Sequence, residues 1–249
     1  MNHSPDRLAA TGLLLRKLER FAPLSAALRS ALSTLAVRVQ DYARGQLIAS
    51  QGESPEESGF VLEGIVFRFK LLPDGGRQIL GMQLPGDFTD PHDFVIRPLD
   101  HAIAAGSPAR LARVPHAALQ SLMEQHPQLI RALMRDMALD AAIGREWLAT
   151  LGRRSAYQQL AHLFCELYFR LEWGGKVRDD SFEFLLTQTD LGDACGLSTV
   201  HVNRSLQALR KDKLIVLEDH TLHVPDMAAL MEAAAFDPAY LYLPKIEAA

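Results

Sequence analysis

The stretch that decides the fold lies toward the C-terminal end and reads Leu186-Thr-Gln-Thr-Asp-Leu-Gly-Asp-Ala-Cys-Gly-Leu-Ser-Thr-Val-His-Val-Asn-Arg-Ser-Leu-Gln-Ala-Leu-Arg210. Thr187 predicts the start of a helix, because its hydroxyl can cap free backbone N–H groups and Asp190 follows three residues later. Gly196 permits a tight turn, and Ser198 can cap a second helix. The apolar residues of that second helix fall on one stripe: Val202, Leu206 and Leu209. The stretch therefore predicts two helices joined by a turn.

The side chains outside this stripe predict contacts with DNA bases. In helix-turn-helix proteins the N-terminal end of the second helix enters the major groove. Arg204 is the first candidate, because arginine can donate two hydrogen bonds to guanine, which is the commonest specific base contact. The predicted base-contacting residues are Thr199, Val200, Asn203 and Arg204. The alternative is an ordinary helix pair in which Arg204 is a solvated surface charge.

Further polar and basic residues flank both predicted helices and are expected to hold phosphates. They are Thr187, Gln188, Ser198, His201, Gln207, Arg210, Lys211 and Lys213. The formal net charge of -4 argues against indiscriminate nucleic-acid binding, but the segment 201–213 has a local basic excess. Residues 214–217 and 221–224 then predict the small β-hairpin of a winged helix. We therefore expect double-stranded DNA as a partner.

Residues 37–114 contain short β-rich runs broken by glycine, proline and aspartate. This pattern is typical of an antiparallel roll or barrel. The clearest hairpin joins strands over residues 60–71 and 77–83 through a glycine-bearing turn at 73–76. Two short helices are predicted before the roll, over residues 8–21 and 23–35.

After Pro115 the apolar residues recur in alternating steps of four and three, which is a heptad seam. Its members are Ile130, Met134, Met137, Ala141, Gly144, Leu148 and Leu151. We interpret this helix as a dimerisation helix; the alternative is that the stripe packs on the roll. Residues 152–155 interrupt the seam and predict a hinge. The fold class is α+β, with a sensor domain over 1–122, a dimerisation helix over 123–152 and a DNA-binding domain over 153–249.

The segment from Gly196 to Arg204, followed by Leu206 and Leu209, resembles the CRP/FNR superfamily of transcription regulators. The resemblance spans nearly the whole chain and is specific for a branch with a His-Val-Asn-Arg signature, here residues 201–204; the ending at 236–241 is also similar. It implies a jelly-roll-type β-roll like that of cyclic-nucleotide-binding domains, a homodimer, and control of transcription through contact with RNA polymerase. Many relatives have a glutamate where this chain has Val200, which can contact a thymine methyl group instead.

The resemblance also bears on the effector. In cyclic-nucleotide-binding relatives, a Gly-Glu segment holds the ribose and an Arg-Ser or Arg-Thr pair holds the phosphate. This chain keeps the turn at 85–88, but Leu-Asp-His-Ala at 99–102 replaces the phosphate-binding pair. Without that arginine we do not expect cyclic AMP to bind. The candidate pocket for an unidentified small-molecule effector consists of Gly86, Asp87, Phe88, Arg97 and His101.

Other cofactors are not expected. An iron–sulfur cluster needs closely spaced cysteines, which the N-terminal region lacks. Haem could use His92, His101 or His116, but a lone histidine in a roll is more simply a surface or hydrogen-bonded residue. Asp90, His92 and Asp93 could bind a metal, but they are more simply a solvated loop, so no metal is predicted. Cys165 and Cys195 are expected to be structural.

The composition limits the remaining classes of protein. The chain of 249 residues is 48% hydrophobic and can bury a full core, yet no apolar run approaches the roughly 20 residues that span a bilayer. Two cysteines and no secretory signal predict a cytoplasmic protein. The sequence contains no motif of a nucleophile elbow, a phosphate-binding loop or a dinucleotide site, so an enzyme is not expected. A DNA-binding regulator and a sensor module that has lost DNA binding remain as alternatives, which salt-dependent DNA binding would separate.

Overall fold

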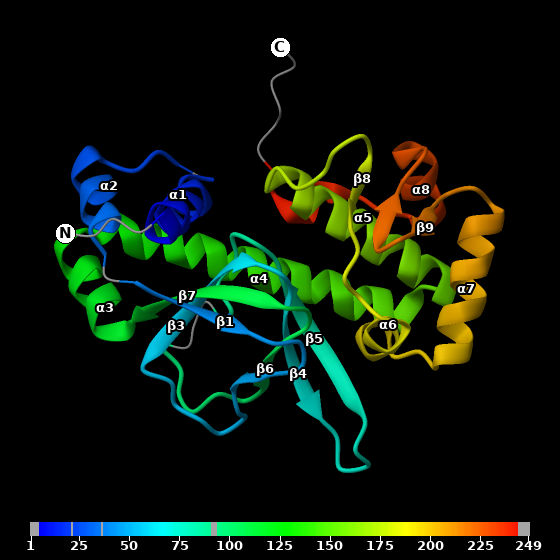
Figure 1. Cartoon of the computed structure of the whole chain (residues 1–249), viewed down its shortest axis with the longest axis horizontal. Coiled ribbons are helices and arrows are strands. Elements are labelled where there is room, and N and C mark those ends of the chain that lie inside the picture. Colours follow the sequence, from blue (N-terminus) through cyan, green and yellow to red (C-terminus); the bar gives the residue numbers. More distant parts are fainter. Residues whose placement is uncertain (1–4, 21, 36, 91–93, 244–249) are drawn as a thin grey trace. The chain divides into compact units, whose positions relative to one another are not determined.

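The computed structural model describes residues 5–20, 22–35, 37–90 and 94–243, and Figure 1 shows the order of the elements. The chain forms two compact units. The first contains the residues up to Lys70 and the segment Gly81–Asp140, and the second contains Leu71–Leu80 and Ala141–Leu243. The boundaries predicted after residues 122 and 152 separate a sensor domain, a dimerisation helix and a DNA-binding domain. They stay a prediction.

Two antiparallel sheets make up the β-roll that the sequence predicts. The first has the strand order β1-β7-β3, and the second has the order β2-β6-β4-β5. The first sheet consists of β1 (Arg38–Tyr42), β7 (Ala109–Pro115) and β3 (Glu57–Glu63). The second consists of β2 (Leu47–Ala49), β6 (Ala102–Ala105), β4 (Val66–Leu71) and β5 (Arg77–Gln83). The expectation of an α+β fold with an antiparallel roll is confirmed.

The structure corrects the long strand predicted over residues 60–71. The chain leaves β3 at Glu63 and enters β4, in the other sheet, at Val66. Gly64 between them has φ +81°, which favours glycine, and a Cβ there would lie 2.2 Å from the Pro108 carbonyl oxygen. Both strands beside Gly64 are almost continuously buried, so the sequence pattern does not mark this change of sheet.

Four helices accompany the roll: α1 (Pro5–Glu19), α2 (Ala26–Ser33), α3 (His116–Gln125) and α4 (Pro127–Arg153). The helices α1 and α2 confirm the two predicted N-terminal helices, although Phe21 lies outside the described residues. Leu14 and Leu28 are buried in one apolar cluster with Phe60 and Phe88 of the roll. Burial of this cluster joins the N-terminal helices to the first unit.

Lys17 forms a buried ion cluster within this unit. Its Nζ lies 2.7 Å from Asp87 Oδ1 and 2.8 Å from Asp136 Oδ1, and its side chain is 4% exposed. Burial by itself lowers the pKa of Lys17, but the carboxylates of Asp136 and Asp87 raise it, so the net direction is upward. Lys17 therefore stays charged and connects α1 to the turn after β5 and to α4.

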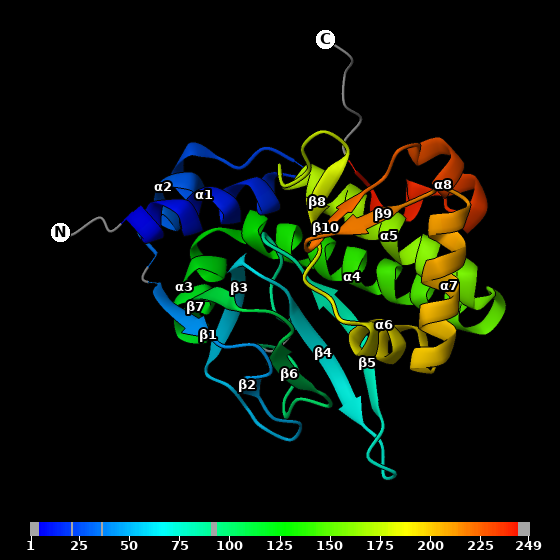
Figure 2. The same cartoon turned by 45° about the vertical axis from the view of Figure 1, so that its right-hand side comes forward.

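The second unit contains the remaining helices and a small sheet, which Figure 2 shows beside α5. Ser155 caps α5 (Ala156–Trp173) with a capping box that includes Gln158. The sheet has the order β8-β10-β9, from β8 (Ser181–Glu183), β10 (Thr221–His223) and β9 (Val216–Glu218). It contains the predicted wing hairpin, whose turn residues Asp219 and His220 have positive φ angles. Helix α8 (Met227–Ala234) and the 3₁₀ helix η1 (Pro238–Leu241) complete the unit.

The chain turns within the segment 152–155, and the hinge predicted there stays a prediction. Helix α4 continues through Gly152 to Arg153, and the chain turns only at Arg154 and Ser155. Partly buried polar contacts hold this turn: Arg154 pairs with Glu146 at 2.9 Å, and the buried His162 lies 3.2 Å from the same carboxylate. Burial and the charge of Arg154 lower the pKa of His162 to about 4, so its imidazole is neutral at neutral pH. The junction is therefore packed rather than open.

Candidate nucleic-acid interface

Two helices that meet at a tight turn form the centre of the interface: α6 (Gln188–Cys195) and α7 (Thr199–Lys211). The predicted capping box is present, since the Thr187 hydroxyl accepts from the Asp190 N–H at 3.1 Å and Asp190 Oδ2 accepts from the Thr187 N–H at 2.9 Å. Ser198 caps α7 by accepting from the N–H of His201. Both predicted helix starts are confirmed.

The turn depends on two glycines, of which the sequence indicated one. Gly196 has φ +62° and ψ +34°, the left-handed conformation that glycine adopts readily. Gly192, one turn earlier in α6, was not singled out from the sequence. A Cβ at Gly192 would lie 2.6 Å from the carbonyl oxygen of Leu197, and Leu197 N–H donates to the Gly192 carbonyl at 2.9 Å. Gly192 therefore allows the backbone after the turn to approach α6.

Gly192→Ala is expected to destabilise the second unit by about 2 kcal/mol, because the added methyl group meets backbone that cannot move aside. Gly152→Ala is the matched control: a Cβ there has no atom within 4 Å, so alanine should stabilise the helix by about 0.5–1 kcal/mol. Thermal unfolding followed by tryptophan fluorescence compares the two variants. Equal unfolding temperatures would contradict the close approach at Gly192.

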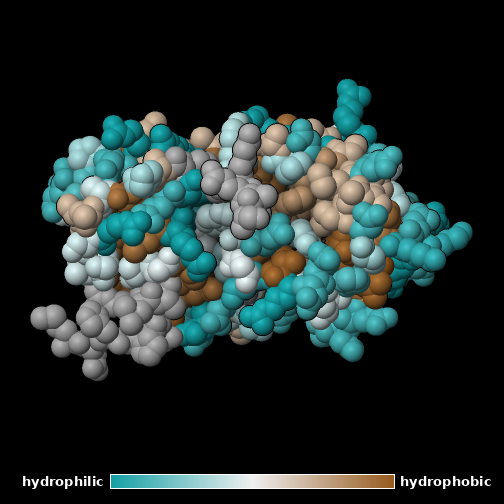
Figure 3. Space-filling view, turned by 90° about the horizontal axis from the view of Figure 1, so that it is seen from above, coloured by the Kyte–Doolittle hydropathy of each residue, from teal (hydrophilic) through white to brown (hydrophobic). Residues whose placement is uncertain are grey.

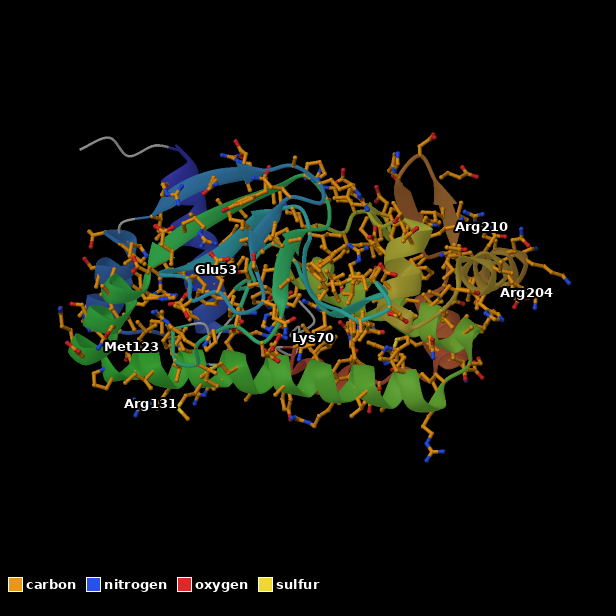
Figure 4. The ribbon with its side chains drawn as sticks, turned by 90° about the horizontal axis from the view of Figure 1, so that it is seen from below. Glu53, Lys70, Met123, Arg131, Arg204 and Arg210 are labelled. Carbon is orange, nitrogen blue, oxygen red and sulfur yellow. The ribbon has the colours of Figure 1, made fainter. Side chains whose placement is uncertain are left out.

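Helix α7 buries one face and exposes the other. Val202 and Leu209 are fully buried and Leu206 is 3% exposed, as the stripe predicted. The four predicted base-contacting residues are all exposed, and Val200 is 64% exposed. Figure 4 shows Arg204 projecting away from the ribbon of α7. The structure brings these four side chains together on one helix face, while their contacts with bases remain a prediction.

The predicted phosphate-contacting residues are exposed as well. Some of them already have neighbours: Asn203 Nδ2 lies 3.5 Å from Gln188 Oε1, and His201 Nδ1 lies 3.0 Å from the Ser198 hydroxyl. Arg210 Nη2 donates to the Leu217 carbonyl of the wing at 3.4 Å.

On the face seen in Figure 3, apolar surface occurs as separate patches among hydrophilic residues, which is ordinary for a protein surface.

Arg77 was missed by the sequence argument, although it affects the charge of α6. Its Nη2 donates to Asp190 Oδ1 at 2.8 Å, and its Nε donates to Asp193 Oδ2 at 2.6 Å. Asp190 is 6% exposed, so its carboxylate needs such a partner. One guanidinium therefore pairs with two carboxylates on the first helix of the motif. No local signal could reveal them, because the partners are more than 100 residues apart.

The heptad seam lies on an exposed face of α4. The exposed fractions of Ile130, Met134, Leu148 and Leu151 are 41%, 58%, 73% and 37%. Ala141 and Gly144 are exposed, Met137 is half-buried, and Leu129 and Leu139 on other faces are buried. The described part of the chain therefore leaves this apolar stripe largely uncovered.

The five predicted effector residues lie in different surroundings. Asp87 pairs with Lys17, the Gly86 N–H donates to the Val61 carbonyl, and the Phe88 ring packs edge-on against Phe60. His101 is 4% exposed and lies between two carboxylates, with Nδ1 2.8 Å from Asp100 and Nε2 3.2 Å from Asp90. Arg97 lines a separate cavity with His116.

The candidate ligands for haem and metal ions lie partly within the described residues. His92 and Asp93 lie outside the described residues. His116 contacts Arg97, and its Nε2 lies 3.1 Å from the Ser58 hydroxyl. Within the described residues there is no group of three or more histidine, cysteine, aspartate or glutamate side chains that could hold a metal ion. No helix in the same part of the chain is both long and apolar enough to cross a membrane.

Comparisons with known proteins agree with both halves of this architecture. Residues 39–126 match the cyclic nucleotide-binding domain family, and residues 158–233 match the Crp-like helix-turn-helix domain family. The transcriptional activator protein FnrL of Cereibacter sphaeroides is 29% identical over 209 residues, which cover 80% of this chain and 81% of that protein. The nitrogen fixation regulation protein FixK of Bradyrhizobium diazoefficiens is 28% identical over 204 residues, covering 78% and 81%. The structure of FixK2 from Bradyrhizobium japonicum has a TM-score of 0.74 at 23% identity, and the match covers 82% of this chain and 100% of that chain.

Proposed function

Because the chain belongs to the CRP/FNR family of transcription regulators, we propose that it acts as a homodimer on a palindromic site in double-stranded DNA. It is a DNA-binding transcription regulator rather than an enzyme. The observation that carries the proposal is the exposed face of α7, where four exposed side chains lie within the first two turns after the Ser198 cap. A helix N-terminus presented in this way suits the major groove.

The exposed stripe of α4 supports the homodimer. Leu148 and Met134 are large apolar side chains that the chain itself leaves more than half exposed. Burying them against the same stripe of a second copy would remove apolar surface from water, and the small Ala141 and Gly144 would allow the backbones to approach. A two-fold dimer would place two recognition helices about 34 Å apart, one turn of DNA.

We also propose that the roll responds to a signal other than a cyclic nucleotide. At the position of the phosphate-binding pair of relatives stands Leu-Asp-His-Ala at 99–102, in which Leu99 is buried and Asp100 is 72% exposed. A hydrogen bond from His101 lowers the pKa of Asp100 to about 2, so this carboxylate is ionised at neutral pH. An ionised carboxylate repels a phosphate, and the residues present therefore do not fit a cyclic nucleotide.

Activation rather than repression is the proposed outcome of DNA binding. FnrL is named a transcriptional activator, and a relative from Pseudomonas protegens is named the transcriptional activator protein Anr. Activation of transcription requires contact with RNA polymerase, which we propose as a further partner.

Selection of binding sites from random DNA, with the wild type and Arg204→Ala in parallel, tests the proposal. The wild type should enrich a palindrome with a guanine in each half-site, and Arg204→Ala should relax that guanine with a loss of about 1–3 kcal/mol in discrimination. Arg178→Ala, which removes an exposed arginine elsewhere in the second unit, should retain the wild-type site.

No enrichment at low as well as moderate salt would instead support the second candidate function, a sensor module without DNA binding. Non-specific DNA contacts strengthen as salt is lowered, so a protein that binds phosphates should show at least that binding.

A further inference from the structure

A cavity of about 630 Å³ lies in the first unit. Its walls come from α3, from the first part of α4 and from the segment between β5 and β6. Figure 4 labels Met123, where α3 runs alongside the beginning of α4. The volume falls within the range of pockets that enclose small molecules, roughly 300–1,000 Å³.

Most of the wall is apolar. Phe94 lines one side, Met123 comes from α3, and Leu133, Met134 and Met137 come from α4. Methionine side chains are flexible and polarisable, so they adapt to ligands of different shape. Leu133 is 2% exposed, which places part of the wall within the packed core. The cavity therefore suits the apolar part of a ligand.

Arg97 and His116 add polar side chains to this wall. Arg97 Nη2 donates to His116 Nδ1, which must then be the unprotonated nitrogen of the ring. The proton on Nε2 can then be donated to the Ser58 hydroxyl at 3.1 Å. Phe94 packs 6.4 Å from the same imidazole, measured between ring centroids. These contacts fix a charged guanidinium at one end of an apolar cavity.

We propose that this cavity binds an apolar monocarboxylate, such as a medium-chain fatty acid, as the effector. Arg97 is the only lysine or arginine among the described lining residues, and its planar fork suits a carboxylate. Glu124 also lines the cavity and disfavours a doubly charged phosphate ester. The hydrocarbon chain would lie against the methionines.

This inference rests on the proposed function, because Met134 and Met137 belong both to the cavity and to the proposed dimer stripe. A ligand that contacts them can change the packing of α4 in the dimer. Ligand binding in the first unit would in this way change the DNA affinity of the dimer.

Isothermal titration calorimetry of the full chain with decanoate, below its micelle concentration, tests the proposal. We expect decanol to bind at least tenfold more weakly than decanoate, because it cannot pair with Arg97. Octanoate should bind roughly fifteenfold more weakly than decanoate, since each buried methylene contributes about fourfold in affinity. Arg97→Gln should weaken decanoate binding at least tenfold and remove its advantage over decanol.

Two further variants test whether decanoate binds in this cavity rather than elsewhere on the protein. Met123→Glu places a carboxylate in the cavity outside the dimer stripe and should abolish decanoate binding while circular dichroism and sedimentation stay unchanged. Arg38→Gln removes an arginine that is 60% exposed on β1, outside the cavity, and should bind decanoate like the wild type. Equal binding of decanoate and decanol, unchanged affinity in Arg97→Gln, or no binding up to about 1 mM overturns the proposal. Decanoate binding is measured without DNA, so it can fail while the site selection that tests the proposed function succeeds.

Discussion

Replacing Lys17 by methionine should destabilise the first unit by about 3–5 kcal/mol. Methionine fills a similar volume, so the loss of stability comes mainly from removing the positive charge of the ammonium group. The carboxylates of Asp87 and Asp136, which lie 2.7 and 2.8 Å from the ammonium group, would remain in the interior without a cation. Denaturation followed by far-ultraviolet circular dichroism measures the loss, while fluorescence of Trp147 and Trp173 follows the second unit separately.

Lys70→Met is the matched control for this result. Lys70 also pairs with an aspartate, Asp100, at 3.0 Å, but the two side chains are 41% and 72% exposed. An exposed pair contributes about 0–1 kcal/mol, so this variant should remain close to the wild type. Adding Asp87→Asn and Asp136→Asn to Lys17→Met should recover part of the lost stability, because the unpaired charges are then removed. Equal losses for Lys17→Met and Lys70→Met would contradict a buried ion cluster.

Leu148→Glu should convert the dimer to a monomer and weaken binding to a full palindromic site by about 100-fold or more. Leu148 is 73% exposed within the chain, so a glutamate there leaves no internal cavity. In the proposed dimer, however, two carboxylates would face each other across an apolar interface. Each recognition helix would then bind its half-site alone, without the gain of linked binding. Analytical ultracentrifugation and fluorescence anisotropy with labelled DNA measure the two effects.

Ala149→Glu provides the control for the added charge. Ala149 is exposed one residue further along α4 and lies off the stripe. This variant should stay dimeric and bind DNA with nearly wild-type affinity. A dimeric Leu148→Glu protein with full affinity would show that the stripe of α4 is not the interface.

The parts of the fold that depend on local chemistry could be predicted from the sequence. The caps at Thr187 and Ser198, the turn at Gly196 and the buried stripe of α7 all follow from residues within one or two helical turns of each other. The heptad seam could likewise be read from its spacing, and its exposure in the structure agrees with an uncovered face.

The features that the sequence did not reveal depend on contacts between distant residues. Arg77 looks like any charged strand residue until the fold places it beside Asp190 and Asp193. Lys17 likewise has the appearance of a solvated helix residue, although it is 4% exposed. At Gly64 the chain changes sheet, and the Pro108 carbonyl oxygen that would clash with a side chain there is more than 40 residues away in the sequence. Each of these requires knowledge of which segments meet in space.

The two buried cysteines have a practical consequence for studying this protein. Burial raises the pKa of Cys165 and of Cys195 to about 12, so at pH 7 only about one thiol in 10⁵ is ionised. Maleimides and methanethiosulfonates react with thiolates, so both native side chains should remain unlabelled in the folded protein. A single cysteine introduced on the exposed surface of α7 could therefore carry a spin label or a fluorophore in the otherwise unaltered chain. Distances between the two copies could then be followed as DNA or a ligand is added.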